Sequence, residues 1–462
     1  MPTTQWTTLL QPLRFRSSAK AQEQHHLDAR NAFDSDYARI ISSAPFRRLQ
    51  DKAQVFPLEK NDFIRTRLTH SLEVSNFARG LGLSVEKKLI EQGVLAPQLK
   101  GQIPSLLATA GLVHDIGNPP FGHFGEEVIQ QYFSKFFKAN YNAEADTYFG
   151  EKWTAEELAD FTNFDGNVQG LRILRKLNLS KDQYSYNLTY PVLASIIKYP
   201  RSSTQGNRKD KTLSYKKFGY FQSESTDFEA INTALQLGNN RHPLTFLLEA
   251  ADDIAYCIAD IEDGCKKGII TQDVLLTILN EYLQNDNCAY LIETFTTISA
   301  SLPNDFPNKI QLIIQEFRVA VQTKMIEEAA TTFMANLNNI HTGAFDADLL
   351  ESSNAKQLRK IFKKLSILNF NHPSVLKREL AGEQLLHFLL EAFTKAIIWP
   401  KGKKESKLCQ LISSNYTYVR NNYTTYPNQS YNDLQLVTDF ISSMTDTYAL
   451  SLYQELSGQV VK

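Results

Sequence analysis

Residues 112–126 read LVHDIGNPPFGHFGE, and this stretch decides the predicted fold because it marks the junction of two helices. Upstream of it, the apolar residues between positions 106 and 113 recur at the spacing of a buried helical face. Gly117 is typical of a residue that follows a last helical turn, and the two prolines after it prevent the helix from continuing. A second helix is predicted to begin near Phe121.

The junction concentrates two histidines and two carboxylates. His114 and Asp115 lie at the predicted end of the first helix, and His123 and Glu126 are three residues apart on one face of the second. Burying a carboxylate without a cation or hydrogen-bond donors costs several kcal/mol, so a divalent ion would satisfy His114 and Asp115 together. The alternative is a surface helix end with hydrogen-bonded polar groups, and this pair alone does not separate the two readings.

The composition of the 462-residue chain narrows the class of protein. Its formal net charge of −1 gives no basic signature for nucleic acid. No apolar run is long enough to span a bilayer, and residues 1–20 lack the apolar core of a secretory signal. The four cysteines show no CxxC spacing, which indicates free thiols in a reducing cytoplasm. Because helical periodicity dominates, the sequence predicts an all-α cytoplasmic protein without membrane spans.

A third histidine, His70, lies at the start of another predicted helix. Thr69 is predicted to cap this helix, which runs to about Gln92. A single histidine in a first helical turn is more often a hydrogen-bonded structural residue than a ligand. His70 is a ligand candidate because a metal site at His114 and Asp115 needs further partners. The predicted apolar stripe of the helix consists of Leu72, Phe77, Leu81, Val85 and Leu89.

Residues 246–260, FLLEAADDIAYCIAD, form a predicted buried helix that is interrupted by acids. Asp252, Tyr256 and Asp260 are spaced by four residues and therefore share one face. Asp253 is rotated by about 100° from Asp252 and points elsewhere. The row of polar residues can supply the missing carboxylate of a metal site, and the alternative is a buried hydrogen-bond network to arginines.

These residues reproduce a known pattern. His70, His114-Asp115 and Asp252 fit the H…HD…D pattern of the HD-domain metal-dependent phosphohydrolases. Longer blocks in the same order resemble the deoxynucleoside triphosphate triphosphohydrolases, the dGTPase family: SAPFRRLQ (43–50), RTRLTHS (65–71), HDIGNPPFGHFGE (114–126), EAADDIAY (249–256) and DFISSMTD (439–446). Two departures are visible. Residues 33–39 read FDSDYAR where a more basic run is common, and Asp165 stands where a Glu is usual.

The resemblance implies a mostly α-helical fold, with an HD-domain helical core and additional carboxy-terminal helices. It also implies hydrolysis of a deoxynucleoside triphosphate, with dGTP as the expected substrate, to a deoxynucleoside and inorganic triphosphate. The matching positions assign the metal ligands His70, His114, Asp115 and Asp252, the catalytic pair His123 and Glu126, and the substrate contacts Gln54, Arg67, Lys198, Lys217, Tyr256 and Asp260. The mixed nitrogen and oxygen donor set suits Mn²⁺ or Mg²⁺, with Fe, Zn or Co as further options.

The segment from Lys198 to Lys217 is strongly basic and suits a substrate that carries about four negative charges. Its two end residues match family positions that contact phosphates, whereas most of residues 201–216 are predicted to form a solvated, mobile loop. A homo-oligomer, a hexamer by the resemblance, and a single-stranded DNA effector are the partners expected besides the dNTP.

The chain is predicted to divide into three parts. Residues 1–60 form an amino-terminal segment and a loop on the substrate side, and residues 61–268 form the HD-type metallophosphohydrolase core. Residues 269–462 form a carboxy-terminal helical extension that packs on the core and takes part in oligomerisation.

Two other functions remain open at this point. The first is another HD-type nucleotide phosphohydrolase, although residues 114–118 lack the HDxxED signature of alarmone hydrolases and the Lys that follows HDIG in cyclic dinucleotide enzymes. The second is a nucleotide or single-stranded DNA binding regulator that retains the HD pocket. The reaction product separates these alternatives, because only the triphosphohydrolase releases inorganic triphosphate.

Overall fold

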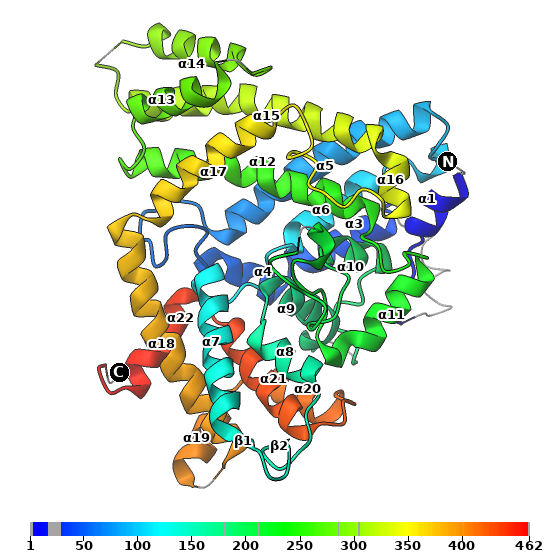
Figure 1. Cartoon of the computed structure of the whole chain (residues 1–462), viewed down its shortest axis with the longest axis vertical. Helices are drawn as coiled ribbons and strands as arrows, with labels where there is room; N and C mark the ends of the chain where they lie inside the picture. The colour runs from blue at the N-terminus through cyan, green and yellow to red at the C-terminus, as the bar shows by residue number, and fades with distance from the viewer. Residues whose placement is uncertain are drawn as a thin grey trace.

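The computed structural model of the protein describes residues 3–16, 29–179, 182–210, 212–284, 286–303, 305–400 and 402–460. Within these ranges the fold is built of helices, with one short antiparallel hairpin of β1 (Tyr141–Asn142) and β2 (Thr147–Tyr148) (Figure 1). The prediction of an all-α fold is therefore confirmed. No helix in the described part of the chain combines the length and the apolar character that a bilayer crossing requires.

Three helices form the centre of the molecule: α5 (Arg67–Glu91), α6 (Gln102–Val113) and α12 (Pro243–Lys266) (Figure 1). Glycines allow α5 and α6 to approach each other closely. A Cβ atom on Gly111 would lie 2.6 Å from the Cα of Ser75, which is closer than real Cβ contacts. The close approach matters because the first turn of α5 carries His70 and the end of α6 is followed by His114, the two histidines of the candidate metal site.

The start of α5 differs from the prediction. Thr66 is the N-cap and Thr69 completes a reciprocal capping box with it, so the prediction of Thr69 as the cap is wrong. Thr69 lies inside the first turn because the helix begins at Arg67, one turn earlier than expected. Leu72, placed on the predicted apolar stripe, is 41% exposed, whereas Val74 and Ala78 are fully buried beside Leu81.

The junction between α6 and α7 (Gly122–Asn140) has the predicted form. Helix α6 ends at Val113, and α7 begins after Phe121, whose φ of 63° lies in the left-handed region. Gly122 follows with a φ of 58°, and a Cβ atom there would lie 2.4 Å from the Arg67 guanidinium. Only glycine allows both this backbone conformation and the close approach of the arginine.

The remaining helices surround this centre. They are α1 (Thr3–Leu9), α3 (Ala32–Ile41), α4 (Ala44–Arg48), α8 (Ala155–Thr162), α9 (Gly166–Arg172), α10 (Tyr190–Ile196), α11 (Ser225–Ala234), α13 (Gln272–Leu283), α14 (Tyr290–Ser301), α15 (Lys309–Ala335), α16 (Leu337–Thr342), α17 (Lys356–Phe370), α18 (Pro373–Ile398), α19 (Lys403–Leu411), α20 (Ser414–Asn422), α21 (Gln429–Ser442) and α22 (Asp446–Leu456).

Two large hydrophobic clusters hold these helices together. The first joins α5, α6 and α12 to α15 and α17, and its buried residues run from Trp6 to Leu365. The second joins α7 to α18 and α21 in the lower half of Figure 1. Each cluster contains residues from both sides of the predicted boundary at residue 268. The three-part division of the chain stays a prediction.

Candidate functional site

Four potential metal ligands from three helices lie close together. His70 comes from the first turn of α5, His114 and Asp115 follow α6, and Asp252 lies on α12. The Nε2 atoms of His70 and His114 lie 3.1 and 3.5 Å from Oδ1 of Asp252. The donor atoms of His70, His114 and Asp115 lie within 4.8 Å of one another. Donors at these separations can share one ion at ordinary coordination distances.

The hydrogen bonding of His114 tests whether these residues fit a metal. Its Nδ1 lies 2.8 Å from the carbonyl oxygen of Gly111, so Nδ1–H donates there. The buried Nε2 then faces carboxylate oxygens at 3.5 and 3.6 Å and has no hydrogen-bond partner among the described residues. Burial opposes protonation of the His114 ring, but Asp115 and Asp252 outweigh it and raise the pKa of His114. A nitrogen atom among carboxylates that attracts positive charge in this way suits a cation, and a backbone carbonyl that accepts the other ring N–H is typical of metal-binding histidines.

Charges within the cluster favour ionised carboxylates. Burial opposes the ionisation of Asp252, but His114, His70 and Lys198 outweigh it and hold the pKa of that carboxyl well below its ordinary range. Burial likewise opposes the ionisation of Asp115, whereas His114 and Arg67 lower the pKa of its carboxyl. Both side chains therefore remain negatively charged oxygen donors near neutral pH.

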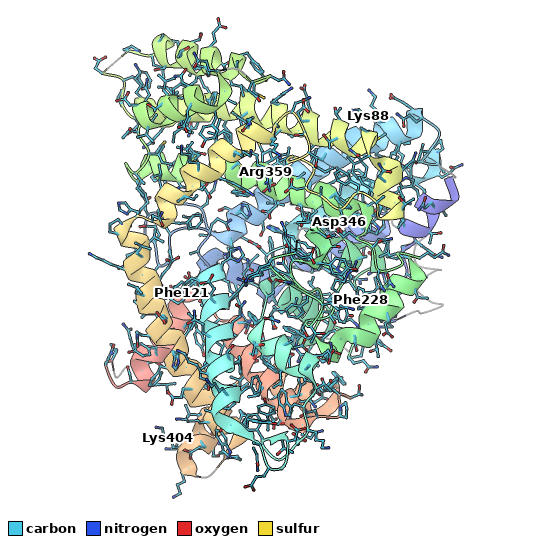
Figure 2. All side chains as sticks on the ribbon, in the orientation of Figure 1. Lys88, Phe121, Phe228, Asp346, Arg359 and Lys404 are labelled. Carbon is cyan, nitrogen blue, oxygen red and sulfur yellow. The ribbon has the colours of Figure 1, made fainter. Side chains whose placement is uncertain are left out.

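Asp253 lies outside this cluster. Its Oδ2 accepts a hydrogen bond from Nε of Arg359 on α17 at 2.6 Å, and Figure 2 labels Arg359 where α17 passes α12. The rotation between adjacent helical residues thus directs Asp252 towards the histidines and Asp253 towards α17.

His123 and Glu126 form a hydrogen-bonded pair on the first turns of α7. Nδ1 of His123 lies 3.1 Å from Oε2 of Glu126, and Oε1 of the same buried carboxylate accepts the backbone N–H of Gly166 at 2.8 Å. The His123 side chain is 75% exposed. The hydrogen bond to Glu126, with the charge of that carboxylate, raises the pKa of His123. An exposed imidazole that is held in its protonated form can donate a proton.

A cavity of about 540 Å³ lies beside the cluster. Seven of the predicted site residues line it, namely Gln54, Arg67, Asp115, His123, Asp252, Tyr256 and Asp260. Arg67 also forms an ion pair with Asp115. Burial raises the pKa of Asp260 to about 7. The cavity therefore contacts the metal candidates, the imidazole and the predicted sugar-side residues together.

The two predicted phosphate-binding lysines, Lys198 and Lys217, do not line this cavity. Nζ of Lys198 is 3.7 Å from Oδ2 of Asp252, and Lys198 lines a second cavity of about 580 Å³ that shares Asp252 with the first. Lys217 forms an ion pair with the buried Asp165, which caps α9. Lys217 lines neither cavity, so its role in binding phosphate stays a prediction.

Several residues at the site were not predicted from the sequence. Glu379 of α18 lines the first cavity, while Lys216 and Arg359 line the second. Burial, followed by the charge of Glu127, raises the pKa of Glu379. Glu379 lies on the exposed side of an amphipathic pattern, where the sequence contains no signal that separates a ligand contact from a solvated acid.

Comparisons with known proteins agree with this geometry. Residues 67–185 match the HD domain family, and residues 352–455 match the phosphohydrolase-associated domain. A deoxyguanosinetriphosphate triphosphohydrolase-like protein of Listeria monocytogenes is 40% identical over 98% of this chain and 99% of its own length. One from Synechocystis is 35% identical over 98% of this chain and 99% of its own. The deoxyguanosinetriphosphate triphosphohydrolase of Cronobacter sakazakii is 32% identical over 96% of each chain.

Fold and site together define an HD-domain phosphohydrolase. Since relatives above 30% identity cover nearly the whole chain, the protein belongs to the deoxyguanosinetriphosphate triphosphohydrolase family.

Proposed function

We propose that the protein is a metal-dependent triphosphohydrolase that converts a deoxynucleoside triphosphate, preferentially dGTP, to a deoxynucleoside and inorganic triphosphate. The observation that carries this proposal is the single cavity of about 540 Å³ that borders Asp115 and Asp252 of the metal cluster and also His123 of the imidazole–carboxylate pair. Hydrolysis at phosphorus needs both an ion that balances charge and a donor that protonates the departing oxygen.

The residues of the chain have separate tasks in this reaction. His70, His114, Asp115 and Asp252 would hold the divalent ion, Mn²⁺ or Mg²⁺ by expectation. When bound, the ion supplies Lewis-acid polarisation of the α-phosphoryl group and activation of water. Arg67 contacts phosphate oxygens from its position beside Asp115.

His123 protonates the 5′-oxygen of the departing deoxynucleoside. Glu126 accepts Nδ1–H of His123, which leaves Nε2–H free to face the substrate. This hydrogen bond also keeps the imidazole charged until the proton is transferred, because it raises the pKa of His123.

Tyr256 and Asp260 contact the sugar. They follow Asp252 by one and two helical turns on the cavity side of α12. A tyrosine ring packed on the deoxyribose leaves no space for a 2′-hydroxyl, so ribonucleotides are excluded. The Asp260 carboxyl, whose pKa is about 7, is available to the 3′-hydroxyl as acceptor or donor.

Glu379 supports guanine as the preferred base. Guanine alone among the four bases presents two adjacent donors, N1–H and N2–H₂, which match the two oxygens of a carboxylate. Glu379 is half-buried in the cavity, and Glu127, which also lines the cavity, is exposed. A half-buried carboxylate that loses its donors disfavours adenine and the pyrimidines.

The decisive test of this function is product analysis. Purified full-length protein is incubated with each dNTP, singly and in pairs, with Mn²⁺ or Mg²⁺, and the products are separated by ion-exchange chromatography. Inorganic triphosphate and deoxynucleoside in equal amounts support the proposal. Phosphate, pyrophosphate or unchanged dNTP under every condition contradicts it.

Base selection is tested with Glu379→Gln. We expect kcat/KM for dGTP to fall roughly 10- to 100-fold, because a charge-assisted hydrogen bond contributes ~1.5–3 kcal/mol. The values for the other three dNTPs should change less than about threefold. Glu383→Gln is the matched control, because Glu383 lies one turn further along α18 and lines neither cavity, and it should retain the dGTP preference. An unchanged preference in Glu379→Gln would assign guanine recognition to another group.

Cytoplasmic location, the hexameric assembly, the single-stranded DNA effector and the division into residues 1–60, 61–268 and 269–462 stay predictions from the sequence. Size-exclusion chromatography with light scattering tests the assembly. A salt-sensitive gel shift with an oligonucleotide tests the DNA effector.

A further inference from the structure

Asp446, the first residue of α22, connects the carboxy-terminal part of the chain to the candidate active site. The residue is 2% exposed. Its Oδ1 accepts the backbone N–H of Phe121 at 3.0 Å, and its Oδ2 accepts the backbone N–H of Ala53 at 3.0 Å. One buried carboxylate therefore joins two segments that are far apart in the sequence.

Lys52 completes a second connection beside the first. The residue is 3% exposed, and its Nζ donates to the carbonyl oxygens of Asn118 and Ser442 at 2.5 and 2.8 Å. Asn118 lies in the junction between α6 and α7, and Ser442 is the last residue of α21. Lys52 and Asp446 thus bind the same junction from two sides.

The segments held in this way carry side chains of the cavity. Phe121 precedes the first turn of α7, which carries His123, and Ala53 precedes Gln54. Phe121 cannot cap α7 with its side chain, and its ring is packed against α18 so closely that a Cβ atom on Gly382 would lie 2.9 Å away. The carboxylate of Asp446 fixes the backbone at the point where α7 begins.

We propose that Asp446 and Lys52 form a clamp that positions the start of α7 so that His123 faces the departing oxygen. Both are positioning residues, because neither touches the metal cluster or lines the substrate cavity. The clamp rests on the proposed function, since it acts through the proton donor of that reaction. Through the clamp, the carboxy-terminal region with α22 helps to position the proton donor of the active site.

The test compares Asp446→Asn with Thr447→Val in the full-length protein. Asn keeps the volume of Asp but offers one acceptor oxygen to two amide donors, so one of the two bonds is lost. Thr447 is the matched control: it lies next to Asp446 and donates to Asp51 at 2.7 Å, but it is exposed and holds no residue of the junction. We expect Asp446→Asn to lower kcat roughly 10- to 100-fold, the cost of small misplacements of a reacting group. Thr447→Val should leave kcat unchanged.

A double-mutant cycle with His123→Ala separates positioning from general support. If Asp446 acts through His123, Asp446→Asn should lower kcat less than about threefold once His123 has been removed. Equal effects in both backgrounds, or no effect in either, overturn the proposal. If Asp446→Asn does not fold, Lys52→Met takes its place in the cycle, and failure of both variants to fold makes the clamp a structural support and overturns the proposal as well.

Hydrogen exchange distinguishes failure of the clamp from failure of the proposed function. Peptides covering residues 118–124 and 51–56 should exchange faster in Asp446→Asn than in wild type and Thr447→Val. A wild-type protein that makes no triphosphate overturns the function, and the exchange data then decide whether the clamp exists. Unchanged exchange in both peptides overturns the clamp even if the enzyme is active.

Discussion

The two histidines at either end of the α6–α7 junction differ in the partner of Nδ1 and in exposure to solvent. His114 donates Nδ1–H to a backbone carbonyl and buries Nε2 beside two carboxylates, which raise the pKa of the ring and would equally attract a metal ion. His123 pairs its Nδ1 with the carboxylate of Glu126, which favours the doubly protonated ring. The first environment suits a metal ligand, and the second suits the proton donor proposed above.

This difference predicts the effects of substitutions at the acid. His123→Ala should retain the metal and bind dNTP, while kcat falls roughly 10²- to 10⁴-fold, the usual contribution of a positioned acid. Glu126→Gln should lower kcat less, because the imidazole stays in place. Metal analysis, dNTP binding and turnover on the same preparations check this. Loss of metal in His123→Ala would place His123 among the ligands, and near wild-type turnover would assign the proton to another donor.

The metal-site residues could be named from the sequence because their types suit a divalent ion and their order matches the pattern of a known family. His70, His114, Asp115 and Asp252, spread over 182 positions, are brought together by the structure as the HD pattern requires. The partners of the lysines could not be predicted. Lys217 pairs with Asp165 across 52 positions, and no local pattern encodes a contact of that kind.

Among the secondary-structure elements, α12 shows how far periodicity alone determines the site. One face of this helix carries Asp252, Tyr256 and Asp260 towards the cavity, and the adjacent Asp253 turns to Arg359. Helical phase fixes this arrangement and could be read from the sequence. The start of α5 could not, since Thr66 and Thr69 are both good caps and tertiary packing selects which turn comes first.

The basic segment between α10 and α11 yields a prediction for individual lysines. Lys198→Ala should lower kcat/KM for dGTP roughly 10- to 100-fold, because Lys198 lies beside Asp252 where a charge-assisted bond to phosphate is worth ~1.5–3 kcal/mol. Lys209→Ala, in the exposed part of the segment, is the control and should have little effect.

Lys217→Ala should lower kcat/KM and, in addition, the melting temperature, since the substitution leaves Asp165 buried without its cation. Equal kinetics in all three variants would mean that the segment only steers substrate by its general charge.

At the scale of the whole molecule, buried polar groups connect helices that are far apart in the sequence. Arg172 of α9 binds Asp439 of α21 and Glu224 in a fully buried network. Asp160 of α8 accepts the N–H of Gln222 at 2.7 Å and the hydroxyl of Tyr431 at 2.6 Å. The all-α class could be predicted from the helical periodicity of apolar residues. These pairings join residues far apart in the sequence and could not be predicted from a single sequence.

Asp160 predicts how stability depends on pH. Burial raises the pKa of its carboxyl to about 7, whereas the unfolded chain releases the proton near its ordinary value of 3.8. Between these values the folded state binds more protons, so this residue lowers stability as pH rises from about 4 to about 7. Asp160→Asn should melt about 2 °C or more above wild type at pH 8, and this advantage should vanish near pH 4. Calorimetry at both pH values checks the prediction, and an equal difference at pH 4 and pH 8 would contradict it.

The bonds made by Asp446 also bear on the order in which parts of the fold form during synthesis. Ala53 and Phe121 are translated early, but the carboxylate that accepts their backbone N–H groups follows 393 and 325 positions later in the chain. A ribosome-bound chain that lacks α22 leaves both amide groups unpaired and the junction before α7 unfixed. The bonds of Asp446 to Ala53 and Phe121 can form only after α22 has left the exit tunnel. Closing so long a loop carries a large entropic cost and belongs to a late step of folding.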